Sequence, residues 1–184
     1  VSALFSSGVG IIKFVADPMS ELPEITFWML GGLWAVSWRQ TFSILPVFLV
    51  GTSLLFLFRW RLNLLSMDDR TAFSLGMAPF RERILLLVSA TAITAAAISV
   101  NGIVGWVGLI IPHIARRLFS SDSRYSLPAS MLLGGMFVVL CDTAARTLLE
   151  GEIPLGVLTS LLGASLFIVL LSKRFVRGSR YAAT

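Results

Sequence analysis

A lone histidine and a serine flanked by small residues are the candidates for acid–base or nucleophilic chemistry in this sequence. His113 follows Pro112 in an apolar stretch and could relay a proton or bind haem iron, because ionisable groups inside membranes are often functional. The alternative is a structural histidine that hydrogen-bonds carbonyl groups freed by Pro112. Ser165 belongs to a Gly-Ala-Ser sequence that resembles part of a hydrolase nucleophile motif, and its base would have to be His113. The apolar surroundings of Ser165 favour a contact between helices instead, so we predict no catalytic residue.

Asp142 and Arg146 form a possible pair of opposite charges, because residues four apart share a helix face. The pair could be purely structural, or Arg146 could present its charge to a partner outside the membrane. His113 and Asp142 together would suit a proton-coupled transporter, which is a further alternative.

The sequence contains no G-x-x-x-x-G-K-[ST] loop, so we do not expect it to hold a nucleotide in that way. With one cysteine and one histidine, we also predict no metal site and no cofactor.

The composition indicates that helices in a lipid bilayer position these residues. Hydrophobic residues make up 56% of the 184-residue chain, charged residues make up 14%, and the mean hydropathy is +0.86. A typical soluble domain has about 25% charged residues, so the composition excludes an ordinary soluble enzyme. The net charge of +5 would suggest a nucleic-acid partner in a soluble protein. In a membrane protein it reflects cytoplasmic loops rich in Arg and Lys, so we predict no nucleic-acid partner.

Uncharged runs predict an all-α membrane bundle that forms a single domain over residues 1–184. The first run is short, so we expect a span that is truncated at its N-terminal side. Residues 25–38 contain three tryptophans and two adjacent glycines, and they predict a short interfacial helix entered through Asp17-Pro18 and Leu22-Pro23. About six transmembrane segments are expected, at residues 1–14, 42–59, 83–100, 103–118, 126–145 and 154–173.

The uncharged run over residues 84–115 could form one crossing or two. As one helix it would be about 48 Å long, against a hydrocarbon core of about 30 Å. Two crossings joined by a turn at Asn101-Gly102 place twelve of the 15 basic residues on one side, whereas one crossing divides them six and nine. Because basic residues gather on the cytoplasmic side, we predict two crossings and a cytoplasmic C-terminus.

The longest polar segment, residues 60–82, is predicted to lie in the cytoplasm and to contain a short amphipathic helix. Ser66 could cap the N-terminus of this helix, Asp69 would favour its first turn, and Gly76 could end it. A solvated loop helix is the simplest interpretation. The alternative is docking to the groove of a soluble partner through the apolar side chains of Ala72, Phe73 and Leu75.

Several motifs, present in order along the whole chain, resemble those of the FecCD-type permeases of ABC importers. The longest is GIVGWVGLIIPHIAR at residues 102–116. One departure is SSDSR at residues 120–124, where such permeases more usually carry Gly-x-Asp-His-Arg. The resemblance implies the C-terminal half of a ten-span permease, from its fifth span to its tenth. The shorter matches are WMLGG at residues 28–32, the loop at 69–76, DTAAR at 142–146 and EIPLGVLT at 152–159.

The resemblance also implies partners and residue roles. A second permease subunit would complete the translocation path as a dimer, expected to be a homodimer, and two separate cytoplasmic ATPase subunits would drive it. A periplasmic or lipoprotein binding protein would deliver the substrate to the outer face, at Arg146. The loop residues expected to dock the ATPase are Ser66, Asp69, Arg70, Ala72, Phe73, Leu75 and Gly76. The residues expected to have a structural role are Gly102, Gly105, Gly108, Pro112, His113, Arg116, Asp142, Pro154 and Gly156.

The function implied by the resemblance is transport across the inner membrane of a prokaryote, not catalysis by this chain. Permeases of this kind move iron–siderophore chelates, cobalamin, haem or molybdate. We expect an iron–siderophore chelate, because these chelates are the largest substrate class of such permeases.

Overall fold

The computed structural model of the chain is built from α-helices. It describes residues 1–34, 36–147 and 153–181, with side chains up to residue 169. Glu150, Glu152 and the last three residues lie outside the described residues. The described part of the chain contains no strand. Its helices are α1 (Ser2–Val15), α2 (Glu21–Leu30), α3 (Trp38–Leu57), α4 (Arg59–Leu65), α5 (Asp69–Ser74), α6 (Pro79–Asn101), α7 (Val107–Leu118), α8 (Ser123–Thr147) and α9 (Leu155–Tyr181).

Among the described residues, three helices, α3, α6 and α8, are long and apolar enough to cross a membrane. The apolar helix α1 and the described apolar part of α9, Leu155–Val169, are shorter. These observations confirm the predicted all-α membrane fold.

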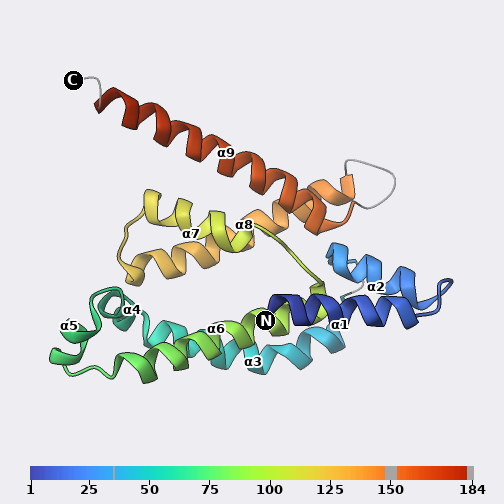
Figure 1. Cartoon of the computed structure of the whole chain (residues 1–184), viewed down its shortest axis with the longest axis horizontal. Helices are drawn as coiled ribbons and strands as arrows, with labels where there is room; N and C mark the ends of the chain where they lie inside the picture. Colours follow the sequence, from blue (N-terminus) through green and yellow to red (C-terminus); the bar gives the residue numbers. More distant parts are fainter. Residues whose placement is uncertain (35, 148–152, 182–184) are drawn as a thin grey trace.

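Local sequence signals set the ends of the long helices. Helix α3 begins with a capping box, in which the Gln40 amide donates to Ser37 Oγ at 3.3 Å and the Ser37 amide donates to Gln40 Oε1 at 2.9 Å. Helix α6 begins at Pro79, a residue suited to a first turn, and it ends before Gly102. Residues 84–115 therefore fold as two helices, and the chain reverses its direction between them (Figure 1).

The helices form two layers (Figure 1). One layer contains α1, α3 and α6, and the other contains α7, α8 and α9, with α9 outermost. Helices α3 and α6 pack closely because Gly51 leaves room for the side chain of Ile93 and the backbone of Ser89. Short helices that adjoin the first layer connect it to the second. Helix α4 contacts α8 at one end of the molecule, and α2 contacts α9 at the other. We call these the α5 end and the α2 end of the molecule.

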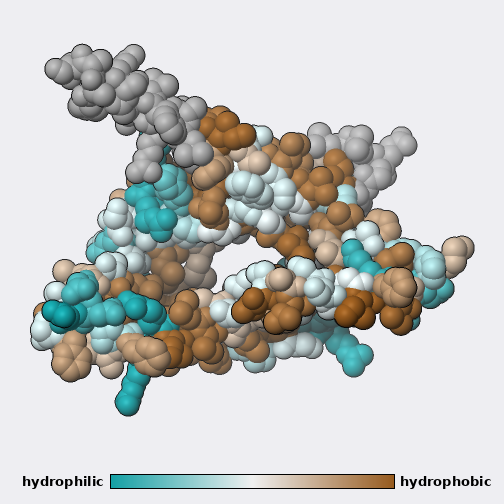
Figure 2. Space-filling model, viewed as in Figure 1, coloured by the Kyte–Doolittle hydropathy of each residue, from teal (hydrophilic) through white to brown (hydrophobic). Residues whose placement is uncertain are grey.

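Most of the long helices expose apolar side chains, as the brown surface in Figure 2 shows. Phe14 on α1 is 91% exposed and Leu132 on α8 is 72% exposed. The small buried core lies at the α2 end, where Cys141 and Ala145 of α8 pack against Leu155 of α9. Such exposed faces suit lipid or further helices, as expected of a multi-pass membrane protein.

The interfacial helix predicted at residues 25–38 is shifted in the structure. Helix α2 begins at Glu21 and ends at Leu30, so Pro23 lies in its first turn, where proline is tolerated. It ends there because Gly31 has φ of 71° and turns the backbone away. Of the three tryptophans, Trp28 alone belongs to this helix.

Candidate functional site

The loop between α3 and α6 folds into two short helices, and Ser66 has a different role from the one predicted. Ser66 directly follows α4, and its hydroxyl donates to the Asn63 carbonyl at 2.6 Å. Helix α5 instead follows Asp68, which makes no side-chain capping hydrogen bond. The prediction that Ser66 caps this helix was wrong, because α4 extends to Leu65 and leaves Ser66 at its C-terminal end.

Helix α5 ends in a Schellman motif centred on Gly76. The Gly76 amide donates to the Phe73 carbonyl at 3.0 Å, and the Met77 amide donates to the Ala72 carbonyl at 3.2 Å. Gly76 has φ of 80°, a left-handed conformation that glycine adopts without strain. Ala72 and Met77 are both buried, so the prediction that Ala72 is available to a partner was wrong. Phe73 and Leu75 remain exposed, at 72% and 59%.

Two ion pairs hold this loop against α6. Arg61 of α4 lies 2.5 Å from Glu82 of α6, and Glu82 is nearly buried. Asp69 at the start of α5 lies 3.0 Å from Arg83 of α6, and both of these side chains are largely exposed. Asp69 therefore fixes α5 to α6, whereas Arg70 beside it is exposed.

A second set of contacts connects the same loop to the turn between α7 and α8. The Asn63 side-chain amide donates to Asp122 Oδ1 at 2.6 Å, and the Ser123 backbone amide donates to Asn63 Oδ1 at 2.8 Å. We call this reciprocal pair the α4–α8 bridge. The Arg124 backbone amide and the Asn63 side chain both donate to the Asp122 carboxylate, so its pKa lies below the usual value. The guanidinium of Arg124 also lies 5.1 Å from the centre of the Trp60 ring.

At the α2 end, three glycines let three segments of backbone touch. Gly31 follows α2, Gly102 follows α6, and Gly156 lies in the first turn of α9. We call these three residues the glycine junction. A Cβ on Gly102 would overlap the Trp28 carbonyl oxygen, and one on Gly156 would lie 2.6 Å from the Ile103 carbonyl oxygen. The Gly156 amide donates to the Gly31 carbonyl at 3.4 Å, so the junction joins the two layers.

The start of α7 depends on a tryptophan in an unusual conformation. Trp106 has φ of 68°, the single positive value among the described residues that are not glycine. Gly163 of α9 lies directly against it, since a Cβ there would come 2.9 Å from Trp106 Cγ. The Trp106 ring packs on Phe167, with centroids 5.8 Å apart. Gly105, which directly precedes Trp106, faces Ser160 at a hypothetical Cβ–Oγ distance of 3.2 Å.

The other residues of α7 that were assigned a structural role do not form a site with Ser165. Pro112 lies inside α7, while His113 and Arg116 lie on its exposed surface. The Ser165 hydroxyl donates to the Leu161 carbonyl at 2.8 Å within α9, and no contact joins it to His113 among the described residues. Gly108 has open space around it, with no atom within 4 Å of a hypothetical Cβ. In the described part of the chain, no three His, Cys, Asp or Glu side chains are grouped as metal ligands.

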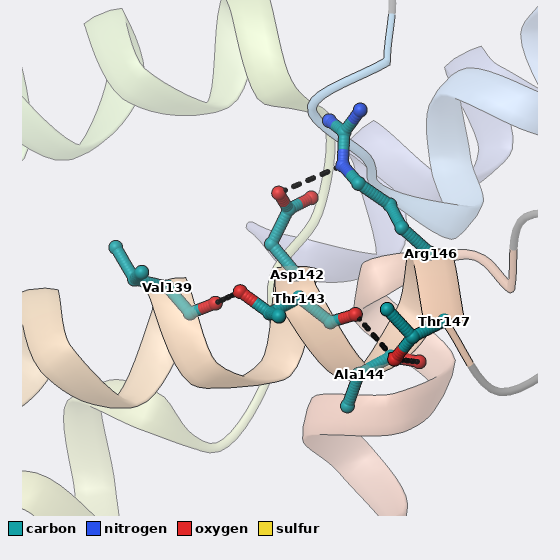
Figure 3. A network of polar contacts seen from close by, with 6 residues as sticks. All are labelled: Val139, Asp142, Thr143, Ala144, Arg146 and Thr147. Atoms are coloured by element: carbon teal, nitrogen blue, oxygen red, sulfur yellow. Dashed lines mark hydrogen bonds and ion pairs between the residues drawn. The ribbon is translucent and has the colours of Figure 1, made fainter.

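The end of α8 carries the pair of opposite charges (Figure 3). Arg146 Nε lies 2.9 Å from Asp142 Oδ2, and the arginine side chain is 44% exposed. The hydroxyls of Thr143 and Thr147 donate to carbonyls one turn earlier in the same helix. Pro154 directly precedes α9, and its carbonyl accepts the Leu158 amide in the first turn of that helix. Ala145, next to Arg146, belongs to the buried core at the α2 end, so the pair lies at the same end of the molecule as the glycine junction.

Comparison with known proteins finds similarity over nearly the whole chain. The family model of the FecCD transport family matches residues 1–173. The molybdate import system permease protein MolB of Haemophilus influenzae is 39% identical over 175 residues, which are 94% of this chain and 51% of the relative. An iron chelatin transport system permease protein of Helicobacter pylori is 40% identical over 171 residues, 93% of this chain and 52% of the relative.

A solved structure is also similar. It is described as an inward-facing conformation of a metal-chelate type ABC transporter, with a TM-score of 0.86 and 40% identity. The match covers 94% of this chain and 56% of the solved chain. The chain thus spans about half the length of the curated relatives it matches.

Proposed function

Because the chain belongs to the FecCD transport family, we propose that it forms part of the permease of a binding-protein-dependent ABC importer. The observation that supports this most is the match of the family model to residues 1–173. The helices of the chain also agree with those of the metal-chelate type transporter at a TM-score of 0.86. ATP hydrolysis would take place in separate subunits.

The orientation we propose places the α5 end in the cytoplasm of a prokaryote, with the C-terminus on the same side and the α2 end outside. Six segments, at the ranges predicted above, would lie in the inner membrane. The position of the basic residues supports this orientation. Arg59 and Arg61 of α4, Arg70 of α5 and the Arg116–Arg117 pair of α7 all belong to the α5 end.

The exposed face of α5 is the proposed docking site for an ATPase subunit. Phe73 and Leu75 present apolar side chains, and Arg70 lies beside them. Ser66, Asp69 and Gly76 would act by shaping the loop, through the contacts described above, whereas Ala72 is buried. Two such ATPase subunits would bind a permease dimer, which we propose to be a homodimer.

The proposed substrate is an iron–siderophore chelate. One of the relatives described above is named for iron chelatin transport, which supports this class, and the other is named for molybdate import. Cobalamin, haem and molybdate are therefore the alternatives to test.

Reconstitution tests the proposal. We would purify the full-length permease with its ATPase and binding protein, place the complex in liposomes, and measure ATP-driven uptake of iron-55 ferrichrome, cobalamin, haem and molybdate. We expect uptake that vanadate stops and that an uncoupler leaves unchanged. Uptake that requires a proton gradient would contradict the proposal and favour the His113–Asp142 alternative. Serine labelling by a fluorophosphonate would favour the hydrolase alternative.

Replacing Arg146 tests the docking of the binding protein at the α2 end. We expect Arg146→Glu to raise the dissociation constant for the binding protein roughly tenfold, or about 1.4 kcal/mol, since it places a second carboxylate beside Asp142 and reverses the presented charge. Surface plasmon resonance on permease in nanodiscs measures this constant. Arg146→Lys keeps the charge and should bind within about threefold of wild type. Unchanged affinity in Arg146→Glu would show that the binding protein docks elsewhere.

A further inference from the structure

The α4–α8 bridge lies at one of the two ends where the layers of the molecule meet. One layer carries the loop with α4 and α5, and the other carries α7, α8 and α9. Helices α4 and α5 follow each other closely in the sequence. Helix α4 ends at Leu65 and α5 begins at Asp69, so three residues separate them. Helix α4 contacts both α5 and α8.

The bridge is suited to hold these two elements together. Asn63 uses its amide group both as donor, to Asp122 Oδ1 at 2.6 Å, and as acceptor, from the Ser123 amide at 2.8 Å. The first of these bonds ends on a carboxylate, and such charge-assisted bonds are stronger than neutral ones. Asn63 and Asp122 are both partly buried, which limits competition from water. The Trp60–Arg124 contact adds a second link between the same elements.

We propose that the α4–α8 bridge is the element that passes movement from the ATPase-docking helix α5 to α7 and α8. Asn63 and Asp122 are positioning residues that make α4 and the start of α8 move as one body. This inference rests on the proposed function, because it requires an ATPase subunit at α5. It adds to that function the contact through which the second layer follows the first.

The chemistry of the bridge predicts an unequal response to two single substitutions. Asn63 Nδ2 lies 2.6 Å from Asp122 Oδ1, and Asn63→Asp would put a carboxylate oxygen in place of that nitrogen. The two carboxylates would repel each other, so the bridge should open. Asp122→Asn should preserve it, because an amide oxygen can still accept from Asn63 and from the Arg124 amide. The double variant Asn63→Asp with Asp122→Asn removes the repulsion between carboxylates but does not rebuild the bridge. The amide nitrogen at 122 would take the place of Oδ1, which also accepts from the Arg124 amide, so two donors would face each other. The bridge should therefore stay open in the double variant.

The experiment follows the α7–α8 turn during the ATP cycle. A nitroxide label is attached to Ser121→Cys, an exposed position outside the bridge, in a background where the buried Cys141 and any other cysteine are replaced. Each permease subunit of the proposed homodimer then carries one label. Pulsed electron spin resonance measures the distance between the two labels in the assembled importer, with ADP and with a non-hydrolysable ATP analogue. Wild type and Asp122→Asn should show a clear nucleotide-dependent shift. Asn63→Asp should lose more than half of it while still binding the ATPase, and the double variant should lose a similar part.

Each outcome bears on one of the two proposals. No nucleotide-dependent shift in wild type, or an unchanged shift in Asn63→Asp or in the double variant, would overturn the role of the bridge. Failure of the wild-type permease to bind any ATPase subunit would instead contradict the proposed function. Membrane yield and gel-filtration profile confirm that Asn63→Asp folds, and if it does not, the milder variant Asn63→Ala, which removes the amide without adding charge, is measured in the same way.

Discussion

Gly102→Ala is expected to reduce the free energy of unfolding by about 3 kcal/mol or more, which would leave little folded permease. Two causes act together at this position. The backbone has φ of 70°, which an alanine adopts only with strain. The added Cβ would also overlap the carbonyl oxygen of Trp28 and would lie 3.0 Å from Gly31 Cα. Backbone atoms cannot rotate away as a flexible side chain can, so α2 and α6 would have to separate.

Gly108→Ala is the matched control for this prediction. It changes a glycine of the same motif to the same residue, but at a helical position with open space around the added Cβ. Thermal unfolding of the detergent-solubilised protein, followed by gel filtration, compares the two variants. Gly108→Ala should unfold near the wild-type temperature or slightly above it, because alanine favours helix. Equal stability of the two variants would show that the glycine junction is not needed for the fold.

Gly76→Val is expected to abolish ATP-driven transport while leaving the amount of protein in the membrane unchanged. Gly76 has open space around it, so the cost comes from the backbone rather than from a clash. Its φ of 80° is strongly unfavourable for a β-branched residue, and the Schellman motif that ends α5 would be lost. The exposed face of α5, with Phe73 and Leu75, would then lie in a different orientation for the ATPase subunit.

Gly76→Asn provides the control, because asparagine enters the left-handed region more readily than other residues with a side chain. Co-purification of the ATPase subunit with each variant, together with uptake into liposomes, measures the effect. We expect Gly76→Asn to retain most of both activities. If the ATPase subunit associates normally with Gly76→Val, α5 is not its docking helix.

The helical fold could be predicted because its signals are local in the sequence. Runs of apolar residues identified the long helices, and the glycine at 102 together with the distribution of arginines indicated the reversal after α6. The ends of the short helices were less predictable. Ser66 is a good N-cap residue by type, but α4 continues to Leu65 and places it at a C-terminal end. Ala72 is apolar and so resembled a docking residue, although the Schellman motif buries it.

The contacts between distant segments could not be predicted from one sequence. Asn63 and Asp122 are 59 residues apart, and neither has a neighbour whose type indicates the other. Gly163 and Trp106 meet only because α9 crosses the start of α7, and nothing near Trp106 in the sequence indicates its left-handed backbone. Gly31 carried a usable signal, because a pair of glycines directly after a helix often marks a close approach of backbone.

The arrangement of the two layers bears on how the protein is made. Each layer comes from a continuous stretch of chain, the first ending at Asn101 and the second beginning at Val107. Helices α3 and α6, the closest pair in the first layer, are neighbours along the chain apart from the short loop helices. The complete α3–α6 hairpin therefore emerges from the ribosome before the second layer does. This hairpin can insert and pack as a unit during synthesis, and the second layer can assemble on it afterwards.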